Sequence, residues 1–309
     1  MGRTIRYLDY LFVLRPTLFF AVWTVFLCGL WAAKTFGQAK EPVAPGQVWQ
    51  LALAISLTMG SVFVVNQLQD VETDLANDKL YLIARKEIPA RHAQIEALLL
   101  LILGLLLAAG VSLLACALCF LLFAVGGFAY SFEPLAWKNH PLLGMAVNGL
   151  GALLIFASGW LAGGELQPRL LRFALPYVLA VLAVYLLTTI PDEPGDRQSG
   201  KVTFVIRYGL RATTLWAAMA VGASLLVGSV NRDPVIALPA LGALPLFGLA
   251  AKRLGLGDIF RAIKFGILFQ ALAVCVVFPL FLVLLAIVFF GSKLYYRGRF
   301  GVDYPSFDS

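Results

Sequence analysis

Long apolar stretches, separated by short polar segments, dominate this chain. Each is long enough to cross a bilayer as a helix, which takes about 20 residues at 1.5 Å per residue. The stretches fall at 14–36, 48–69, 94–112, 114–131, 142–164, 173–191, 212–230, 234–250 and 266–290. The pattern predicts an all-α fold, a polytopic membrane bundle of about nine transmembrane helices, within a single membrane-embedded domain over residues 1–309.

Composition excludes a water-soluble protein. Hydrophobic residues make up 61% of the chain and charged residues 13%, whereas soluble domains carry about one-quarter charged residues. The net charge of +7 fits the charge asymmetry of membrane loops and contact with anionic lipid headgroups. We therefore expect membrane lipid as a partner, no nucleic acid and no obligatory protein partner.

The distribution of Lys and Arg predicts the orientation in the membrane. With the N-terminus inside, nine crossings place 16 of the 24 basic residues in cytoplasmic segments and 8 on the opposite side. Three of those 8 lie in the C-terminal tail. The positive-inside rule thus predicts a multi-pass protein of the cell membrane, with a cytoplasmic N-terminus and an external C-terminus.

A first acidic window follows the second apolar stretch. Asn66, Asp70 and Asp74 recur every four residues, a spacing that places them along one stripe of a helix. The stripe begins inside an apolar span, where a carboxylate is costly unless it is paired or binds a cation. A solvated helix end is the alternative interpretation.

A second window holds Asp192, Glu193 and Asp196, and its Pro and Gly residues predict a helix end or broken turn. An Asp-, Gly- and Pro-rich loop is the alternative. Four predicted helices separate the two windows. Because an even number of crossings returns the chain to the same side, both windows are expected on one face of the membrane, which we predict to be cytoplasmic.

Carboxylates gathered on one membrane face suit Mg²⁺, which prefers oxygen ligands and is often completed by substrate phosphates. The four predicted ligands, which would also be catalytic, are Asp70, Asp74, Asp192 and Asp196. Two Mg²⁺ ions between the windows would bind a diphosphate, and nearby cations could neutralise its oxygens. The candidate cations are Lys79, Arg85, Arg197 and Lys201. Positive-inside anchoring is the alternative for these residues.

Several motifs together resemble a known family. The paired aspartate motifs, a Gly-x4-Gly-Lys run ending at Lys201, the segment from Tyr130 to Lys138 and the Arg15-Pro16 start of the first helix are similar to those of the UbiA superfamily of intramembrane prenyltransferases. The resemblance extends over nearly the whole chain.

This resemblance implies a helical bundle around a central cavity with a cytoplasmic cap. The four aspartates would hold two Mg²⁺ ions on a prenyl diphosphate, with Asn66 supporting the site and Tyr130 and Lys138 near the diphosphate or the acceptor. The isoprenoid tail would lie in an apolar groove. The implied reaction moves a polyprenyl group to an acceptor and releases pyrophosphate.

Departures from the family pattern bear on the acceptor. Gln67 and Thr189 stand where many relatives have Asp, and residues 84–88 replace a common Arg-Pro-x-x-x-Gly run. The resemblance to the family implies an aromatic quinone precursor as acceptor, since prenylation of such precursors is widespread among its members. The alternatives are a glycerol-phosphate lipid, a phosphoribosyl acceptor and intramolecular terpene cyclisation. From a different class, a secondary transporter would use its intramembrane acids to bind a coupling cation.

Overall fold

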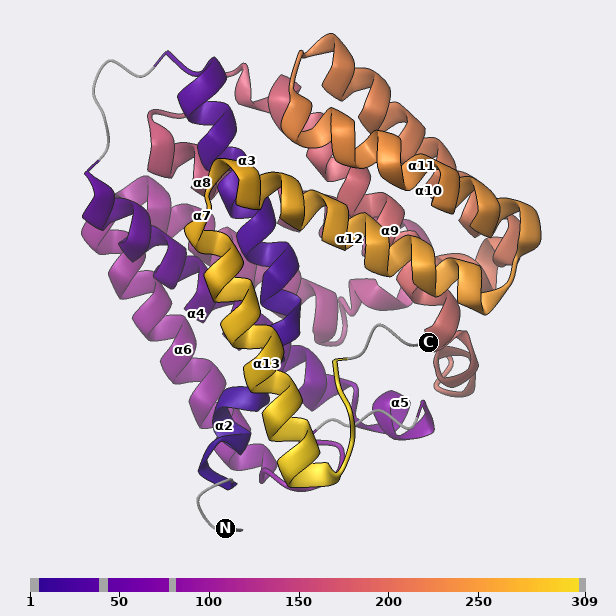
Figure 1. Cartoon of the computed structure of the whole chain (residues 1–309). Helices are drawn as coiled ribbons and strands as arrows, with labels where there is room; N and C mark the ends of the chain where they lie inside the picture. The colour runs from indigo at the N-terminus through magenta and orange to yellow at the C-terminus, as the bar shows by residue number, and fades with distance from the viewer. Residues whose placement is uncertain (1–5, 39–43, 78–81, 306–309) are drawn as a thin grey trace.

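The computed structural model describes residues 6–38, 44–77 and 82–305, and within them every regular element is a helix. Figure 1 shows the arrangement. The elements are α2 (Asp9–Phe12), η1 (Pro16–Leu18), α3 (Phe19–Phe36), α4 (Pro45–Gln69), α5 (Val71–Ala76), α6 (Ala90–Val111), α7 (Leu113–Phe123), the π-helical η2 (Ala124–Ala129), η3 (Trp137–Asn139), α8 (Pro141–Gly163), α9 (Leu170–Gln198), α10 (Phe204–Val230), α11 (Pro234–Arg253), α12 (Leu256–Val277) and α13 (Leu280–Phe300).

Within the described ranges, nine helical stretches are long and apolar enough to cross a membrane, and α7 with η2 forms a shorter apolar helix. The all-helical membrane fold is thus confirmed. The lipid-facing character is visible on α6, where Leu98 is 58% and Leu106 is 64% exposed. Leucines so exposed on a helix of this length are expected to contact hydrocarbon rather than water.

The predicted span 266–290 is wrong in detail, because this run forms the end of α12 and the start of α13. The break falls at Phe278, whose backbone leaves the helical region with φ −124° and ψ 80°. Pro279 follows, and a proline disfavours the helical conformation of the residue before it. The continuous apolar composition of the run concealed this turn.

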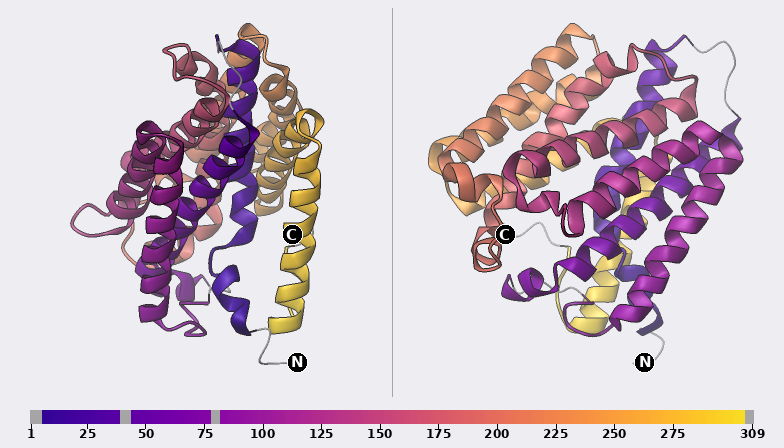
Figure 2. Two further views of the ribbon diagram at one scale, coloured as in Figure 1. Left: turned by 90° about the vertical axis from the view of Figure 1, so that its left-hand side faces the viewer. Right: turned by 180° about the vertical axis from the view of Figure 1, so that it is seen from behind.

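Within the described residues, the nine long helices and the shorter α7–η2 helix together give ten crossings where the sequence predicted nine, and this corrects the predicted topology. The C-terminal end of α13 lies beside the N-terminal segment, since Tyr295 and Arg299 both contact Asp9. Figures 1 and 2 show α13 as an outer helix that returns past α3 to the end of the bundle where α2 lies. The prediction that the C-terminal tail lies opposite the N-terminus is therefore wrong. The basic residues Lys293, Arg297 and Arg299 belong to the side that already carries most Lys and Arg.

Helices α3 and α8 approach each other closely through paired glycines. A Cβ built on Gly29 would lie 2.0 Å from the carbonyl oxygen of Phe156, and one on Gly159 would lie 1.8 Å from that of Phe26. Glycine at both crossing positions therefore allows the two backbones to pack together, as small residues do in membrane helix pairs. This pair forms one wall of the cavity described below.

We predict that Gly159→Ala lowers the free energy of unfolding by about 3 kcal/mol, at the upper end of overpacking costs, because backbone must move to admit the methyl group. Unfolding of the purified protein in detergent, followed by tryptophan fluorescence, measures the change. Gly248→Ala is the matched control, since a Cβ there meets nothing within 4 Å. Equal stability of the two variants would contradict the packing described.

Candidate active site

A cavity of ≈ 470 Å³ opens among α3, α4, η2, α8 and α9. One end of it is polar and the remainder apolar. The polar lining comprises Arg15, Asn66, Asp70, Thr73, Asp74, Tyr130, Lys138, Asn148, Tyr185, Thr188, Thr189, Asp192, Asp196, Lys201 and Thr203. Both acidic windows therefore border one cavity, which is consistent with the shared membrane face predicted from the number of crossings between them.

The first acidic motif lies at a helix break rather than along one continuous helix. Helix α4 ends at Gln69, Asp70 has φ −106° and ψ 14°, and α5 begins at Val71. The predicted helical stripe is thus interrupted at Asp70, although the Asp74 amide still donates to the Asp70 carbonyl at 2.8 Å. The break allows the Asp70 side chain to meet two lysines from other segments.

The second acidic motif lies at a helix end, as one of the two predicted alternatives has it, but the helix continues through the motif without the predicted broken turn. Helix α9 runs through Pro191 and Pro194 to Gln198, so Asp192 and Asp196 are one helical turn apart. Contacts beyond the helix hold this terminal turn. The Lys201 amide donates to the Asp196 carbonyl at 2.9 Å. Asn77, which follows α5, accepts a hydrogen bond from the Gly195 amide.

Asn77 links the two acidic motifs. Its Oδ1 accepts a hydrogen bond of 3.0 Å from the Gly195 amide, and its Nδ2 donates to the Asp192 carbonyl at 3.5 Å. A Cβ on Gly195 would lie 2.4 Å from Asn77 Oδ1, so any larger residue there would displace the Asn77 side chain from this contact. Thr73 adds a second link by donating to Ser199 Oγ at 3.1 Å. The spacing between the motifs is therefore fixed by direct contacts.

Asp70 is the electrostatic centre of the polar end. Its Oδ1 lies 2.8 Å from Lys138 Nζ and 2.5 Å from Lys201 Nζ, and all three side chains are largely buried. Burial alone would raise the pKa of Asp70, but the two ammonium groups outweigh it and hold the pKa below its usual range. Burial lowers the pKa of Lys138. The carboxylate therefore remains ionised at neutral pH.

Two of the cations that line the cavity belong to segments with a left-handed backbone residue. Arg15 itself has φ 56° and ψ 64°, and Ala136, two residues before Lys138, has φ 33° and ψ 50°. The left-handed region costs a non-glycine residue on the order of 1 kcal/mol or more, and such conformations concentrate at functional sites. Both segments direct a cation into the cavity.

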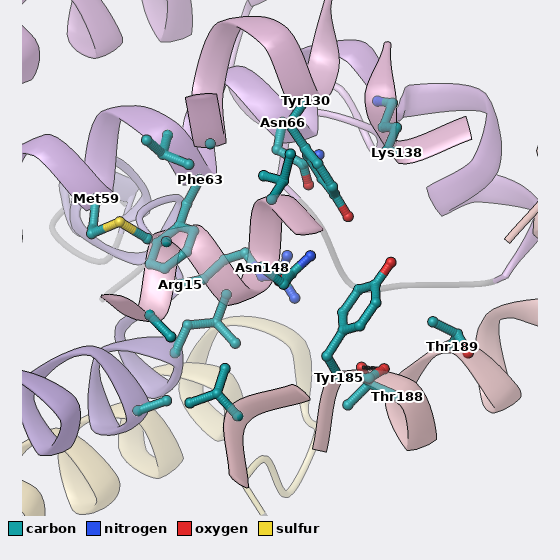
Figure 3. Close-up of a pocket in the computed structure, with 18 of the residues that line it drawn as sticks. Arg15, Met59, Phe63, Asn66, Tyr130, Lys138, Asn148, Tyr185, Thr188 and Thr189 are labelled. Atoms are coloured by element: carbon teal, nitrogen blue, oxygen red, sulfur yellow. Dashed lines mark hydrogen bonds between the residues drawn. The ribbon is translucent and has the colours of Figure 1, made fainter. Parts of the chain in front are cut away.

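Tyr130, Asn148 and Tyr185 form a connected polar group in the middle of the cavity. The Tyr130 hydroxyl interacts with the side chains of Asn148 and Tyr185. Figure 3 shows the Tyr130 and Tyr185 side chains from opposite sides of the cavity, with Arg15 extending toward the space between them. Tyr130 directly follows the π-helical η2, and π-helical turns often occur at functional sites.

Sequence reasoning did not identify Arg15, Asn148 and Tyr185 as site residues. A signal for Tyr185 was available, since positions 185, 189, 192 and 196 follow helical spacing and place it on the face of the second motif. Of the three, Arg15 was noted only as part of a family-like motif, the Arg15-Pro16 start of the first helix. Their convergence depends on packing between distant helices.

Of the residues proposed from sequence, the cavity brings together the four aspartates with Asn66, Tyr130, Lys138 and Lys201. Two cations are not brought there. Arg85 is exposed on the segment before α6, and Arg197 is 62% exposed and pairs with Glu193 at 2.6 Å. Lys79 lies outside the described residues.

The donor set fits a hydrated magnesium ion better than a metal held by protein ligands alone. Among the residues that the structure describes, no three His, Cys, Asp or Glu side chains converge closely enough to enclose a metal ion. Mg²⁺ commonly takes one or two carboxylates and completes its octahedron with water and substrate phosphate oxygens. The two pairs of aspartates at one end of the cavity could supply such partial ligation.

The rest of the cavity is apolar and lies between the bundle helices. Its lining comprises Leu18, Ala21, Val22, Val25, Met59, Val62, Phe63, Leu122, Val147, Ala152, Ile155 and Val181. A ligand with an anionic head group would match the charged end of the cavity, and a hydrocarbon tail on the same ligand would match these apolar side chains. The fold and the site thus define a polytopic membrane protein with a cavity suited to an amphipathic, anionic ligand.

The model of the UbiA prenyltransferase family matches residues 21–255, and the chain belongs to this family. Among curated proteins, it is 27% identical to digeranylgeranylglyceryl phosphate synthase of Methanospirillum hungatei JF-1 over 186 residues, covering 58% of this chain and 63% of that protein. It is 30% identical to the synthase of the same name from Methanoculleus marisnigri over 181 residues, covering 57% and 63%. The matched region is thus less than two thirds of either relative's length.

A solved structure shares the fold. The UbiA homologue from Archaeoglobus fulgidus bound to DMAPP and Mg²⁺ aligns with a TM-score of 0.65 at 18% identity, covering 87% of this chain and 99% of that one. At this identity the likeness establishes the arrangement of helices.

We predict that Asp70→Asn lowers the free energy of unfolding at pH 7 by about 3 kcal/mol, because two buried ammonium groups lose their counter-charge. A carboxylate with a lowered folded pKa stabilises the fold above its unfolded value of about 3.9, and this contribution is lost as pH falls through the folded value. The difference between wild type and variant should therefore be constant from pH 8 to pH 5 and shrink only under stronger acid.

Detergent unfolding curves measured across this pH range test the prediction. Asp258→Asn is the control, since Asp258 pairs with the exposed Arg261 at 3.3 Å and such surface pairs contribute about 1 kcal/mol or less. A difference between wild type and Asp70→Asn that disappears already at pH 5 would show that Asp70 is not held ionised by the lysines.

Proposed function

We propose that this protein transfers a prenyl group from a prenyl diphosphate to an acceptor in a Mg²⁺-dependent reaction that releases pyrophosphate. The observation that carries the proposal is that two DxxxD motifs and two lysines lie together at the polar end of an otherwise apolar cavity. Membership of the UbiA prenyltransferase family supports it.

The polar end of the cavity would bind the diphosphate. Asp70, Asp74, Asp192 and Asp196 would hold Mg²⁺, with two ions as the stoichiometry that two carboxylate pairs favour. When bound, Mg²⁺ neutralises charge on the diphosphate as the leaving group develops. Lys138 and Lys201, already directed at Asp70, would donate to phosphate oxygens. Asn66 lines the same end of the cavity and would support the site.

The apolar region would favour ionisation of the allylic C–O bond by excluding water. The bond's electron pair leaves with pyrophosphate, and the resulting allylic cation must be protected from water. Burial among apolar side chains excludes water, while the ring faces of Tyr130 and Tyr185 can stabilise positive charge. An acceptor hydroxyl oxygen then forms the new C–O bond and loses its proton.

The acceptor that the comparisons favour is a glycerol-phosphate lipid rather than the aromatic quinone precursor expected from sequence. Both curated relatives are named digeranylgeranylglyceryl phosphate synthase, which matches an alternative we had kept open. Arg15 supports this assignment, since a guanidinium within the cavity can bind a phosphate through two hydrogen bonds. No observation favours a phosphoribosyl acceptor, cyclisation or transport.

We propose that the polar end of the cavity faces the cytoplasm of the cell. The loops at this end, and the returning C-terminal end of α13, carry most of the Lys and Arg residues. The positive-inside rule places such a side in the cytoplasm.

Replacing Asp196 should remove transfer. We expect Asp196→Asn to lower kcat/KM at least about 100-fold, equivalent to about 2.7 kcal/mol of transition-state stabilisation. Glu193→Gln is the matched control in the same window, because Glu193 pairs with the exposed Arg197. It should keep a near-normal rate. The assay follows pyrophosphate release and product mass with geranylgeranyl diphosphate, Mg²⁺ and geranylgeranylglyceryl phosphate.

Equal losses in the Asp196 and Glu193 variants, or none in either, would contradict the assignment of the second motif. Product formation with an aromatic hydroxy acid but not with the glycerol-phosphate lipid would retain prenyl transfer and reject the proposed acceptor.

Arg15 should determine acceptor binding. We expect Arg15→Gln to raise the KM for geranylgeranylglyceryl phosphate about 30-fold, the loss of a charge-assisted pair worth about 2 kcal/mol. The KM for geranylgeranyl diphosphate should change little, because Lys138 and Lys201 remain. Steady-state kinetics with each substrate varied in turn measure both values. A rise confined to the KM for the diphosphate would reassign Arg15 to the donor.

A further inference from the structure

A buried polar cluster outside the cavity joins the two ends of the described chain. Asp9, 3% exposed, accepts 3.2 Å hydrogen bonds on Oδ1 and Oδ2 from Nε and Nη2 of Arg299. The Tyr295 hydroxyl also donates to Asp9 Oδ1 at 2.6 Å. Arg299 Nη2 donates to Glu87 as well. The forked geometry and burial make this a specific contact rather than a chance surface pair.

Ring stacking strengthens the same junction. The rings of Phe12 and Tyr295 are parallel, with centroids 3.7 Å apart, and Tyr296 meets Phe12 edge to face at 5.9 Å. Beyond α13, the Tyr304 hydroxyl lies 3.2 Å from Thr17 Oγ1. Helix α13 and the chain after it therefore hold the N-terminal segment from Asp9 to Thr17 at several points.

Arg15 lies inside that segment. Its left-handed backbone lies between α2, where Asp9 and Phe12 are held, and η1, where Thr17 is held. Gln67 of α4 fixes the segment from the other side, since its buried Nε2 donates to the Val13 carbonyl at 2.7 Å. An ionised aspartate at position 67 would have no proton to donate. Gln67 is therefore suited to this particular N-terminal arrangement.

We propose that α13 is a strap that positions Arg15, with Asp9, Tyr295 and Arg299 as positioning residues for acceptor binding. This inference rests on the proposed function. Asp9 and α13 both lie outside residues 21–255, which the family model matches, so the family core does not supply the contact. A non-glycine residue in the left-handed region persists only where its surroundings hold it, and the strap provides that constraint from outside the cavity.

The test compares Arg299→Gln with Arg297→Gln in the full-length protein. Arg297 is exposed on the last turns of the same helix and provides the matched control. We expect Arg299→Gln to increase amide hydrogen exchange over residues 13–18 and to raise the KM for geranylgeranylglyceryl phosphate about tenfold, the loss expected from a charged hydrogen bond. The kcat and the KM for geranylgeranyl diphosphate should stay near wild type. Tyr295→Phe, which keeps the stacked ring, should give a smaller change in the same direction.

Combining Arg299→Gln with Arg15→Gln separates positioning from a general loss of stability. If the strap acts through Arg15, Arg299→Gln should raise the acceptor KM no further in the Arg15→Gln background. Additive effects would overturn the proposal, as would unchanged exchange over residues 13–18 in Arg299→Gln. Increased exchange with an unchanged acceptor KM would reduce the cluster to a structural contact and overturn its positioning role.

Failure of the proposed function would give a different result. A wild-type protein that forms no product with this acceptor would contradict the proposed reaction. The exchange comparison does not depend on turnover, and equal exchange in Arg299→Gln and Arg297→Gln would still reject the strap.

Discussion

The ionised carboxylate of Asp70, buried at the end of a membrane-spanning helix, is the constraint on which the polar end of the cavity depends. A charge at that depth is costly unless cations meet it, and two lysines from separate loops do so. Lys138 reaches it from the loop before α8, and Lys201 from the loop after α9. Neutralising this one group therefore brings together three parts of the chain that are far apart in sequence.

The same arrangement prepares the site for chemistry. The Asn77 contacts with Gly195 and Asp192 fix the distance between the acidic motifs, so metal and diphosphate would meet ligands already in place. The glycine-paired crossing of α3 and α8 supports the apolar wall that would receive the hydrocarbon tail. Preorganised charge at one end and water exclusion along the other are the two requirements for ionising an allylic diphosphate.

Sequence pattern predicted the membrane class, the two acidic motifs and their shared face, because hydropathy, DxxxD spacing and the number of crossings are local properties of the chain. It missed the turn at Phe278 because the apolar run is continuous there, and this error reversed the predicted side of the C-terminal tail. It also placed Arg197 in the site, whereas the helical turn directs Arg197 outward to Glu193. Arg15 was missed as a site residue because its place in the cavity depends on packing between segments that are distant in sequence.

The most direct test of the central claim is a crystal structure with Mn²⁺ in place of Mg²⁺ and geranylgeranyl thiolodiphosphate, a poorly reactive substrate analogue. Anomalous scattering from Mn²⁺ locates the metal independently of the protein phases. The account predicts Mn²⁺ coordinated by at least one carboxylate from each acidic motif, with the diphosphate beside Lys138 and Lys201 and the tail along the apolar wall. Metal bound to one motif alone, or a diphosphate outside this cavity, would contradict it.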